Sequence, residues 1–162
     1  MIKLVSTVGF FIVNEENKIL LIKQCDEEKK DASTDGKLIS LKEESENILE
    51  EKWMVPSGNL EENDNPRAVI KKEVKKCLNC EVTDCNYFNL YFYDISDNFI
   101  KKIAYFYGTI EGEIKTKNEQ MSAEWVSLDR KEIDGLNLIP EQKEALNDFL
   151  VFFQNKSLGN AE

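Results

Sequence analysis

Apolar runs separated by short polar breaks open the chain. Residues 4–13 are largely apolar, residues 14–17 are the polar sequence Asn-Glu-Glu-Asn, and residues 19–22 are apolar again. Two apolar runs around a short polar turn predict a β-hairpin. Neither run is long enough to cross a bilayer, and no small-residue cleavage site follows the first. We therefore expect a cytoplasmic chain without a membrane segment.

Two later stretches have the spacing of amphipathic helices. The first should begin at Pro66, after a polar cap within residues 63–65, and end near Leu78. The second should begin at Pro140, with a polar tail over residues 155–162 that is expected to fray. The two apolar stripes comprise Ile70, Val74, Cys77 and Leu78 in the first helix and Leu146, Phe149, Leu150 and Phe153 in the second. Both stripes are typical of helices that pack on a core.

Between the two helices, aromatic and β-branched residues predict strands. Residues 86–95 and 99–110 form two such runs, joined by a turn at Ser96-Asp97-Asn98. Tyr91 and Tyr93 on the first run could stack on a base. Alternating aromatics on a strand more often pack in a core or across a strand pair, and both interpretations stay open here.

Two short apolar runs and one charged stretch complete the pattern. Residues 53–55 (Trp-Met-Val) and 124–126 (Glu-Trp-Val) are predicted as short strands, and Pro56-Ser57-Gly58 is a turn signal after the first. Residues 25–52 carry clusters of Lys and Glu, which favours an insertion, either a solvated loop or a lid over a site. Because 162 residues fit one core, we expect residues 1–162 to form a single domain.

Composition narrows the chemistry that such a domain can carry. The chain has 31 acidic and 21 basic residues, a net charge of -10, and no histidine. The acidic balance opposes a large nucleic-acid or anionic-membrane surface, although a local basic patch can still hold a small phosphorylated ligand. The absence of histidine excludes Ser/His/Asp and Cys/His nucleophilic sites. Carboxylates, lysines or cysteines must therefore carry any chemistry.

The four cysteines, at positions 25, 77, 80 and 85, include one CxxC pair. A structural zinc site normally requires four ligands, and the fourth thiolate here would be the distant Cys25. Buried and chemically inert thiols are therefore favoured over a zinc or redox site.

One charged residue falls inside the apolar face of the first helix. Glu73 lies between Val69 and Cys77 on the helical wheel. A carboxylate in such a position is costly unless it is paired or bound to a cation. An ion pair with Lys76, one turn further on, is the structural interpretation, and a metal ligand is the functional one.

The stretch from residue 53 to residue 80 resembles the catalytic box of the Nudix (MutT-like) hydrolases. That box reads G-x5-E-x7-R-E-U-x-E-E-x-G-U, in which U is a bulky apolar residue. The flanks are similar as well: a strand ending in a Pro-small-Gly turn, a later Glu-Trp-Val strand and an apolar C-terminal helix. The resemblance covers most of the chain apart from residues 25–52, and it implies an α/β fold, a Nudix-like α/β/α sandwich with a mixed β-sheet.

Several positions of the box are kept or changed conservatively. The residues that match it are Gly58, Glu73 and Val74. Asp64 takes the place of Glu and Lys72 that of Arg, which keeps the charge but loses the bidentate fork of Arg. Asn79 replaces the glycine that ends the helix, and Asn tolerates the left-handed cap conformation.

Two acids of the box are lost, and the chemistry that the resemblance implies depends on them. Family enzymes cut a diphosphate linked to a nucleoside, and they hold divalent metal with three helix glutamates. Lys76 and Cys77 stand where two of those acids should be, so that only Glu73 remains of the three. An ammonium at Lys76 can pair with a phosphate but cannot supply a metal-bound water.

Three hypotheses follow from the resemblance. The first is a protein that binds a nucleotide-type small molecule with weak or lost hydrolysis. The second is an active Mg²⁺- or Mn²⁺-dependent hydrolase that recruits acids outside the box, and the third is a protein-interaction module. A homodimer is compatible with each of them. Candidate replacement acids are Glu61, Glu62, Glu119 and Glu124.

The resemblance assigns roles to six residues. Glu73 and Glu119 are the candidate catalytic acids, and Glu73 and Glu61 are the candidate metal ligands. The candidate ligand-binding residues are Gly58, Lys72 and Lys76. Mg²⁺ or Mn²⁺ is the expected cofactor if hydrolysis is retained, and no cofactor is expected if it is lost.

Overall fold

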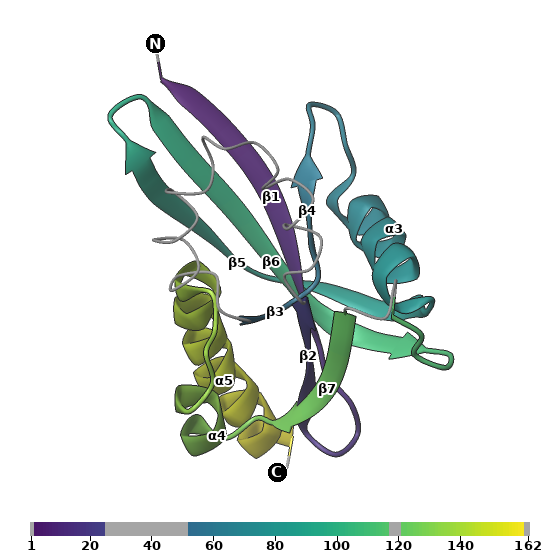
Figure 1. Cartoon of the computed structure of the whole chain (residues 1–162). Coiled ribbons are helices and arrows are strands. Elements are labelled where there is room, and N and C mark those ends of the chain that lie inside the picture. The colour runs from purple at the N-terminus through teal and green to yellow at the C-terminus, as the bar shows by residue number, and fades with distance from the viewer. Residues whose placement is uncertain (1, 25–51, 117–120, 161–162) are drawn as a thin grey trace, which may run out of the picture.

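The computed structural model describes residues 2–24, 52–116 and 121–160. The predicted insertion (apart from Lys52), Cys25 and Glu119 fall outside these ranges. The strands are β1 (Lys3–Ile12), β2 (Lys18–Gln24), β3 (Trp53–Met54), β4 (Ser57–Leu60), β5 (Glu81–Ser96), β6 (Phe99–Glu111) and β7 (Met121–Ser127). The helices are α3 (Pro66–Leu78), α4 (Arg130–Asp134) and α5 (Pro140–Asn160) (Figure 1).

The described strands form two sheets between two groups of helices. The four-stranded sheet has the order β4-β1-β6-β5, in which β1 is parallel to β6 and antiparallel to β4. The three-stranded sheet has the order β3-β2-β7 and is antiparallel. In Figure 1, α3 lies on one side of the strands and α4 and α5 lie on the other. The predicted α/β/α sandwich with a mixed sheet is therefore confirmed.

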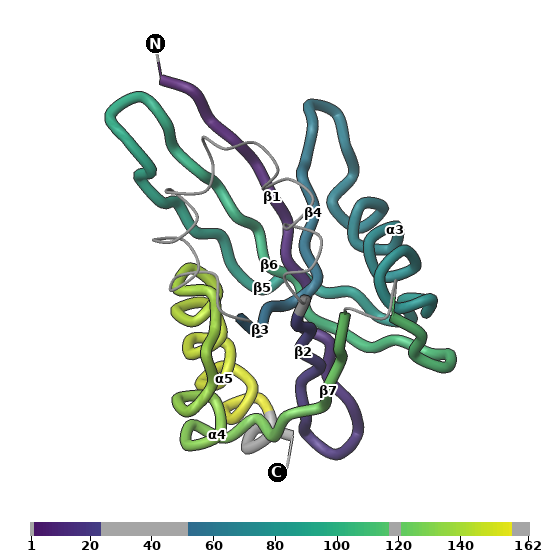
Figure 2. Tube along the Cα trace, in the orientation of Figure 1, coloured from purple at the N-terminus to yellow at the C-terminus, as the bar shows by residue number. Residues whose placement is uncertain are grey.

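The predicted hairpin between the first two apolar runs is only partly right: the turn closes with the Asn14 amide donating to the Lys18 carbonyl at 3.0 Å, but β1 and β2 do not continue as a ladder. β1 pairs with β4 and β6, whereas β2 pairs with β3 and β7, and a single described bridge, Val13 to Ile19, joins the two runs. The reason is burial on both faces: Phe10, Phe11 and Ile12 are each at most 1% exposed. A strand that is apolar on both faces needs cover on both sides, so the polar turn carries the chain from one sheet to the other (Figure 2).

The turn predicted at Pro56-Ser57-Gly58 is only partly right. The chain does change direction between β3 and β4, but Ser57 and Gly58 already belong to β4. They pair with Gly9 and Val8 of β1. A short strand that contains a glycine has a weak β-propensity. Residues 57–60 form a strand because they pair with the central strand β1.

Both predicted helices are present. α3 has the predicted limits; the Asn65 side chain caps it by accepting from the Arg67 and Ala68 backbone amides, and Asn79 ends it in the left-handed conformation, with φ of 59°. α5 begins at Pro140 as predicted and continues to Asn160, further than the expected start of the tail. The short helix α4 was not predicted. No helix in the described ranges is long and apolar enough to cross a membrane.

Two apolar clusters, one on each side of the four-stranded sheet, make up the core. The cluster under α5 contains Phe11, Tyr105, Leu146, Phe149 and Leu150, and the cluster under α3 contains Phe10, Ile70, Val74, Leu78 and Phe106. The three fully buried residues of the predicted α5 stripe therefore pack as expected, with Phe153 at the margin. Tyr91 and Tyr93 also pack on the α5 cluster.

One glycine is required by close packing inside the sheet. Gly9 on β1 is the register partner of Tyr105 on β6. A Cβ added at Gly9 would lie 2.6 Å from Cε1 of the Tyr105 ring. The ring therefore lies against the bare backbone of β1, and Phe11 stacks on it with centroids 5.0 Å apart.

We expect Gly9→Ala to destabilise the fold, because the added methyl group must displace a fully buried ring. Overpacking of this kind costs about 1–3 kcal/mol, measurable as a loss in the free energy of unfolding in urea. Gly135→Ala is the matched control, since Gly135 has right-handed helical dihedrals and its added Cβ meets nothing closer than 3.6 Å. Equal stability of the two variants would contradict the packing argument.

Candidate functional site

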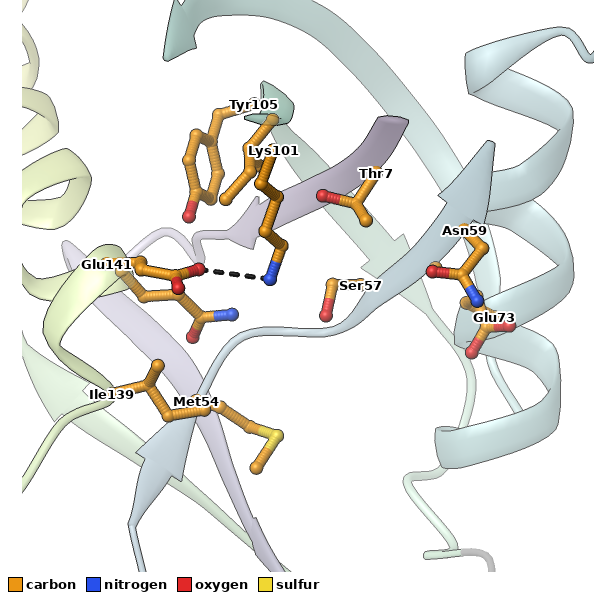
Figure 3. Close-up of a pocket in the computed structure, with 12 residues that line it drawn as sticks. Thr7, Met54, Ser57, Asn59, Glu73, Lys101, Tyr105, Ile139 and Glu141 are labelled. Atoms are coloured by element: carbon orange, nitrogen blue, oxygen red, sulfur yellow. Dashed lines mark hydrogen bonds and ion pairs between the residues drawn. The ribbon is translucent and has the colours of Figure 1, made fainter. Parts of the chain in front are cut away.

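A hollow of about 340 Å³ lies where the four-stranded sheet meets α3 and the start of α5. Polar side chains from five elements reach its walls (Figure 3). They are Thr7 of β1, Ser57 and Asn59 of β4, Glu73 of α3, Lys101 and Tyr105 of β6, and Glu141 and Gln142 of α5. The hollow is therefore made by the tertiary fold and not by one continuous motif.

Two of the residues that the sequence singled out, Gly58 and Glu73, meet in this hollow. A Cβ on Gly58 would lie 2.8 Å from Cγ of Glu73 and 3.0 Å from Cγ1 of Val69. Glycine at this position therefore allows β4 to lie directly against α3. The close approach fixes the Glu73 side chain at the edge of the hollow.

The environment of Glu73 does not include the expected ion pair. In the described part of the chain, its one polar contact is with Cys77, whose Sγ lies 4.0 Å from Oε2. Lys76 is exposed and forms no ion pair with it. The ion pair between Glu73 and Lys76, which was the structural interpretation, is thus not observed. The Glu73 carboxylate lines the hollow instead.

The remaining predicted site residues lie elsewhere. Lys72 and Lys76 are exposed on α3 and are not among the residues that line this hollow. Glu61 lines a second hollow of about 500 Å³, together with Glu62 and Asp64. The Glu61 backbone amide donates to the Asp64 carboxylate at 2.8 Å, so Asp64 stabilises the loop before α3.

A divalent metal does not fit the donors that α3 provides around Glu73. Mg²⁺ takes hard oxygen ligands, usually more than one carboxylate. Around Glu73, α3 offers a thiol at Cys77 and an ammonium at Lys76 in place of carboxylates. No cluster of three His, Cys, Asp or Glu side chains that could hold a metal occurs in the described ranges.

The opposite wall of the hollow was not anticipated from the sequence. Lys101 Nζ lies 3.0 Å from Glu141 Oε2, and both side chains are about one-third exposed, at 31% and 30%. Lys101 interrupts an otherwise apolar face of β6, which is a signal that could have been noticed. Glu141, in contrast, is an acid in the first turn of a helix, where acids are common for electrostatic reasons alone.

Two buried polar side chains stand next to this ion pair. Gln142 is 8% exposed, and its Oε1 accepts from the backbone amide of Val55 at 2.9 Å. Tyr105 is fully buried, and its hydroxyl has no hydrogen-bond partner among the described residues. Burial raises the pKa of Tyr105 above its usual range, so the hydroxyl is a protonated donor at neutral pH.

The structure is similar to solved structures of MutT and Nudix hydrolases. MutT from Methanosarcina mazei matches with a TM-score of 0.64 at 17% identity, covering 96% of each chain. The MutT Nudix hydrolase of Burkholderia pseudomallei matches with a TM-score of 0.62 at 14% identity, covering 90% of this chain and 97% of its own. The chain has a MutT-like Nudix fold.

A third example of the Nudix fold, the Nudix hydrolase of Nitrosomonas europaea, matches with a TM-score of 0.62 at 17% identity, covering 91% of this chain and 88% of its own. No protein-family model and no curated protein matches the sequence. At these identities the likeness establishes the Nudix fold, and the chemistry depends on this chain's own residues.

The hydrogen bond from Val55 to Gln142 ties the residue that follows β3 to α5, and its loss should be measurable. We expect Gln142→Leu to leave the Val55 amide buried without a partner, at a cost of about 1–3 kcal/mol in the free energy of unfolding. Gln154→Leu, at an exposed position of α5, is the matched control and should change the same free energy little. If the Gln142→Leu protein is as stable as the control, the hydrogen bond makes no net contribution to the free energy of unfolding.

Proposed function

We propose that this chain binds a nucleotide-type small molecule in the hollow and has weak or no hydrolytic activity. The observation that carries the proposal is the donor set on α3. Glu73 is the one that remains of the three helix acids of the box, and Lys76 and Cys77 occupy the positions of the other two. The Nudix fold supports a nucleotide derivative as the ligand class, since the neighbours compared above are hydrolases named MutT or Nudix.

The proposal of weak hydrolysis rests on the charged side chains of α3. A bound metal activates water and neutralises phosphate charge during phosphoryl or pyrophosphoryl chemistry. Here one carboxylate and no neighbouring acid face the hollow from α3, and a lysine ammonium lies one turn away. Lys76 can pair with a phosphate group outside the hollow by charge-assisted hydrogen bonds, without any metal.

The main alternative is hydrolysis supported by acids outside the box. Glu61 and Glu62 favour it to a limited extent, because both line the second hollow and Thr7 lies on the wall of each hollow. Glu119 belongs to the same alternative but lies outside the described residues. A protein-interaction module is the third hypothesis, and a homodimer is compatible with all three.

Restoring the two acids tests the proposal directly. We expect the native chain to release little phosphate or pyrophosphate from a panel of nucleoside di- and triphosphates with Mg²⁺ or Mn²⁺. The Lys76→Glu, Cys77→Glu double variant should gain metal-dependent release, because three carboxylates at i, i+3 and i+4 then share one helical face. Adding Glu73→Gln to the double variant should abolish the gain.

Two controls separate the hypotheses. Lys71→Glu adds an acid at an exposed position of α3 and should give no turnover, which excludes a simple effect of net charge. Nucleotides should raise the melting temperature of the native chain in EDTA, as expected when a ligand binds the folded state. Turnover by the native chain would favour the alternative hydrolase, and neither turnover nor stabilisation would favour the interaction module.

A further inference from the structure

The face of the four-stranded sheet that packs against α3 is covered over only part of its length. Along β1 the side chains change from exposed at Lys3 and Leu4 to fully buried from Val8 onward. In Figure 1, the ends of β1, β5 and β6 nearest the N-terminus extend beyond both α3 and α5. A parallel strand pair such as β1 and β6 is normally covered on both faces. Over the first half of β1, no helix among the described residues provides this cover on the α3 side.

The strand register shows which side chains share this part of the sheet. Directly paired residues on neighbouring strands project from the same face. Leu4 of β1 pairs with Ile100 of β6, and in the next row Lys102 of β6 pairs with Phe92 of β5. Ala104, two residues further along β6, packs on the cluster under α3. These rows therefore lie on the α3 side of the sheet, the opposite side from Lys101 and the first hollow.

Two large apolar side chains on this part of the sheet are exposed. Leu4 is 52% exposed and Phe92 is 60% exposed. Leu60 of β4, which lies in the same row as Phe92, and Ile100 are half-buried beside them. We call the surface formed by Leu4, Leu60, Phe92 and Ile100 the open face. Single exposed apolar residues are common on protein surfaces, whereas a contiguous apolar surface with a polar rim is typical of a docking site.

The rim of the open face is acidic. Glu61, Glu62 and Asp64 line the second hollow together with Leu4 and Leu60. All three acids are exposed, and none forms an ion pair with a described residue. Lys102 is the one basic residue among the described residues that line this hollow. Acids therefore outnumber bases three to one here.

The second hollow suits one long basic side chain of a partner. Its apolar walls include Leu4, Leu60 and Ala104, and its volume is about 500 Å³. Lysine and arginine pack their methylene stems on apolar surface and keep the charged group at a polar edge. At that edge, the carboxylates of Glu61 and Glu62 can accept charge-assisted hydrogen bonds. Shape and charge thus favour the same kind of occupant.

We propose that the open face docks a cationic amphipathic helix of a partner protein. The apolar side of the helix covers Leu4 and Phe92, and one lysine or arginine enters the second hollow beside Glu61 and Glu62. A helix is the expected element because helices already cover the rest of this face and the opposite face of the sheet. The inference goes beyond the proposed function, since the open face and the first hollow lie on opposite sides of the sheet.

Charge favours this occupant over others that an apolar surface could attract. The chain has a net charge of -10, which opposes an anionic membrane or a nucleic acid. A second copy of the chain would bring the same excess of acids to the interface, and like charges at close range oppose association. A basic partner meets neither penalty, and the acidic surface also accelerates its association.

Titration with a model peptide tests the inference, without nucleotide. The probe is a fluorescent peptide of about 18 residues, long enough to form a helix, with leucine on one side and lysine on the other. We expect the native chain to bind it, and to bind a counterpart with glutamate in place of lysine at least about tenfold more weakly. Raising the salt concentration should weaken binding of the lysine peptide. Fluorescence anisotropy measures each affinity.

Variants of the open face locate the binding. Phe92→Ser should weaken binding of the lysine peptide about tenfold, as expected for a central apolar contact. Val151→Ser is the matched control, because Val151 is 46% exposed but lies on α5, and it should change the affinity less than about twofold. Neither variant should lower the melting temperature appreciably, since both side chains are largely in solvent.

A second pair of variants separates the acidic rim from net charge. The Glu61→Gln, Glu62→Gln double variant should weaken binding about fivefold. The Glu15→Gln, Glu16→Gln double variant removes the same charge from two exposed acids in the turn before β2. It should change the affinity less than about twofold.

Each outcome decides the inference. Binding of the lysine peptide that is lost in Phe92→Ser and in the Glu61, Glu62 double variant, and kept in both controls, supports it. No binding by the native chain, equal binding of the two peptides, or equal losses in variants and controls overturns it. Sedimentation that shows a dimer dispersed by Phe92→Ser assigns the open face to a second copy, and vesicles of anionic lipid that bind in the same way assign it to a membrane. Either result overturns the inference and leaves the proposed function in place.

Discussion

The parallel pairing of β1 with β6 is the constraint on which the rest of the structure depends. It sets Gly9 opposite Tyr105 and places β1 in the middle of the four-stranded sheet, with β4 on its other side. β4 in turn lies directly against α3 because Gly58 has no side chain. One register therefore brings the α3 wall and the β6 wall to the two sides of the same hollow. A shift of a single residue would turn Tyr105 to the opposite face of the sheet.

The two helices contribute differently to this arrangement. α5 covers one face of the sheet with a large aromatic cluster, in which Phe149 packs against Phe11, Phe88 and Tyr107. Its first turn then supplies Glu141 and Gln142 to the hollow. α3 packs through Ile70, Val74 and Leu78, and Glu73 projects beside this buried face. Each helix thus places side chains at the hollow while its neighbouring residues are buried in the core.

How much could be predicted from the sequence depended on whether the signal was local. Pro66, Asn65 and Asn79 fix the limits of α3 through caps that act within a few residues, and this helix was predicted correctly. Partner choice between strands is not local, and the predicted hairpin, which extends no further than the bridge between Val13 and Ile19, shows the consequence. Gly58 and Glu73, which meet at the hollow, were singled out because one continuous motif contains both, whereas Lys72 and Lys76 of the same motif do not line the hollow. The β6 and α5 wall was not, because Lys101 and Glu141 are 40 residues apart and meet only in the folded chain.

The separation of the two walls also supports the proposed function, in which binding persists where hydrolysis is weak. Charge at the α3 wall determines whether a metal can be held, and the substitutions at positions 76 and 77 act there. The donors at the opposite wall are fixed by other contacts: the Tyr105 ring by Phe11 and Gly9, and Gln142 by the Val55 amide. None of these contacts involves α3. A change in the acids of the box therefore leaves these contacts of the β6 and α5 wall in place, as the proposed function requires.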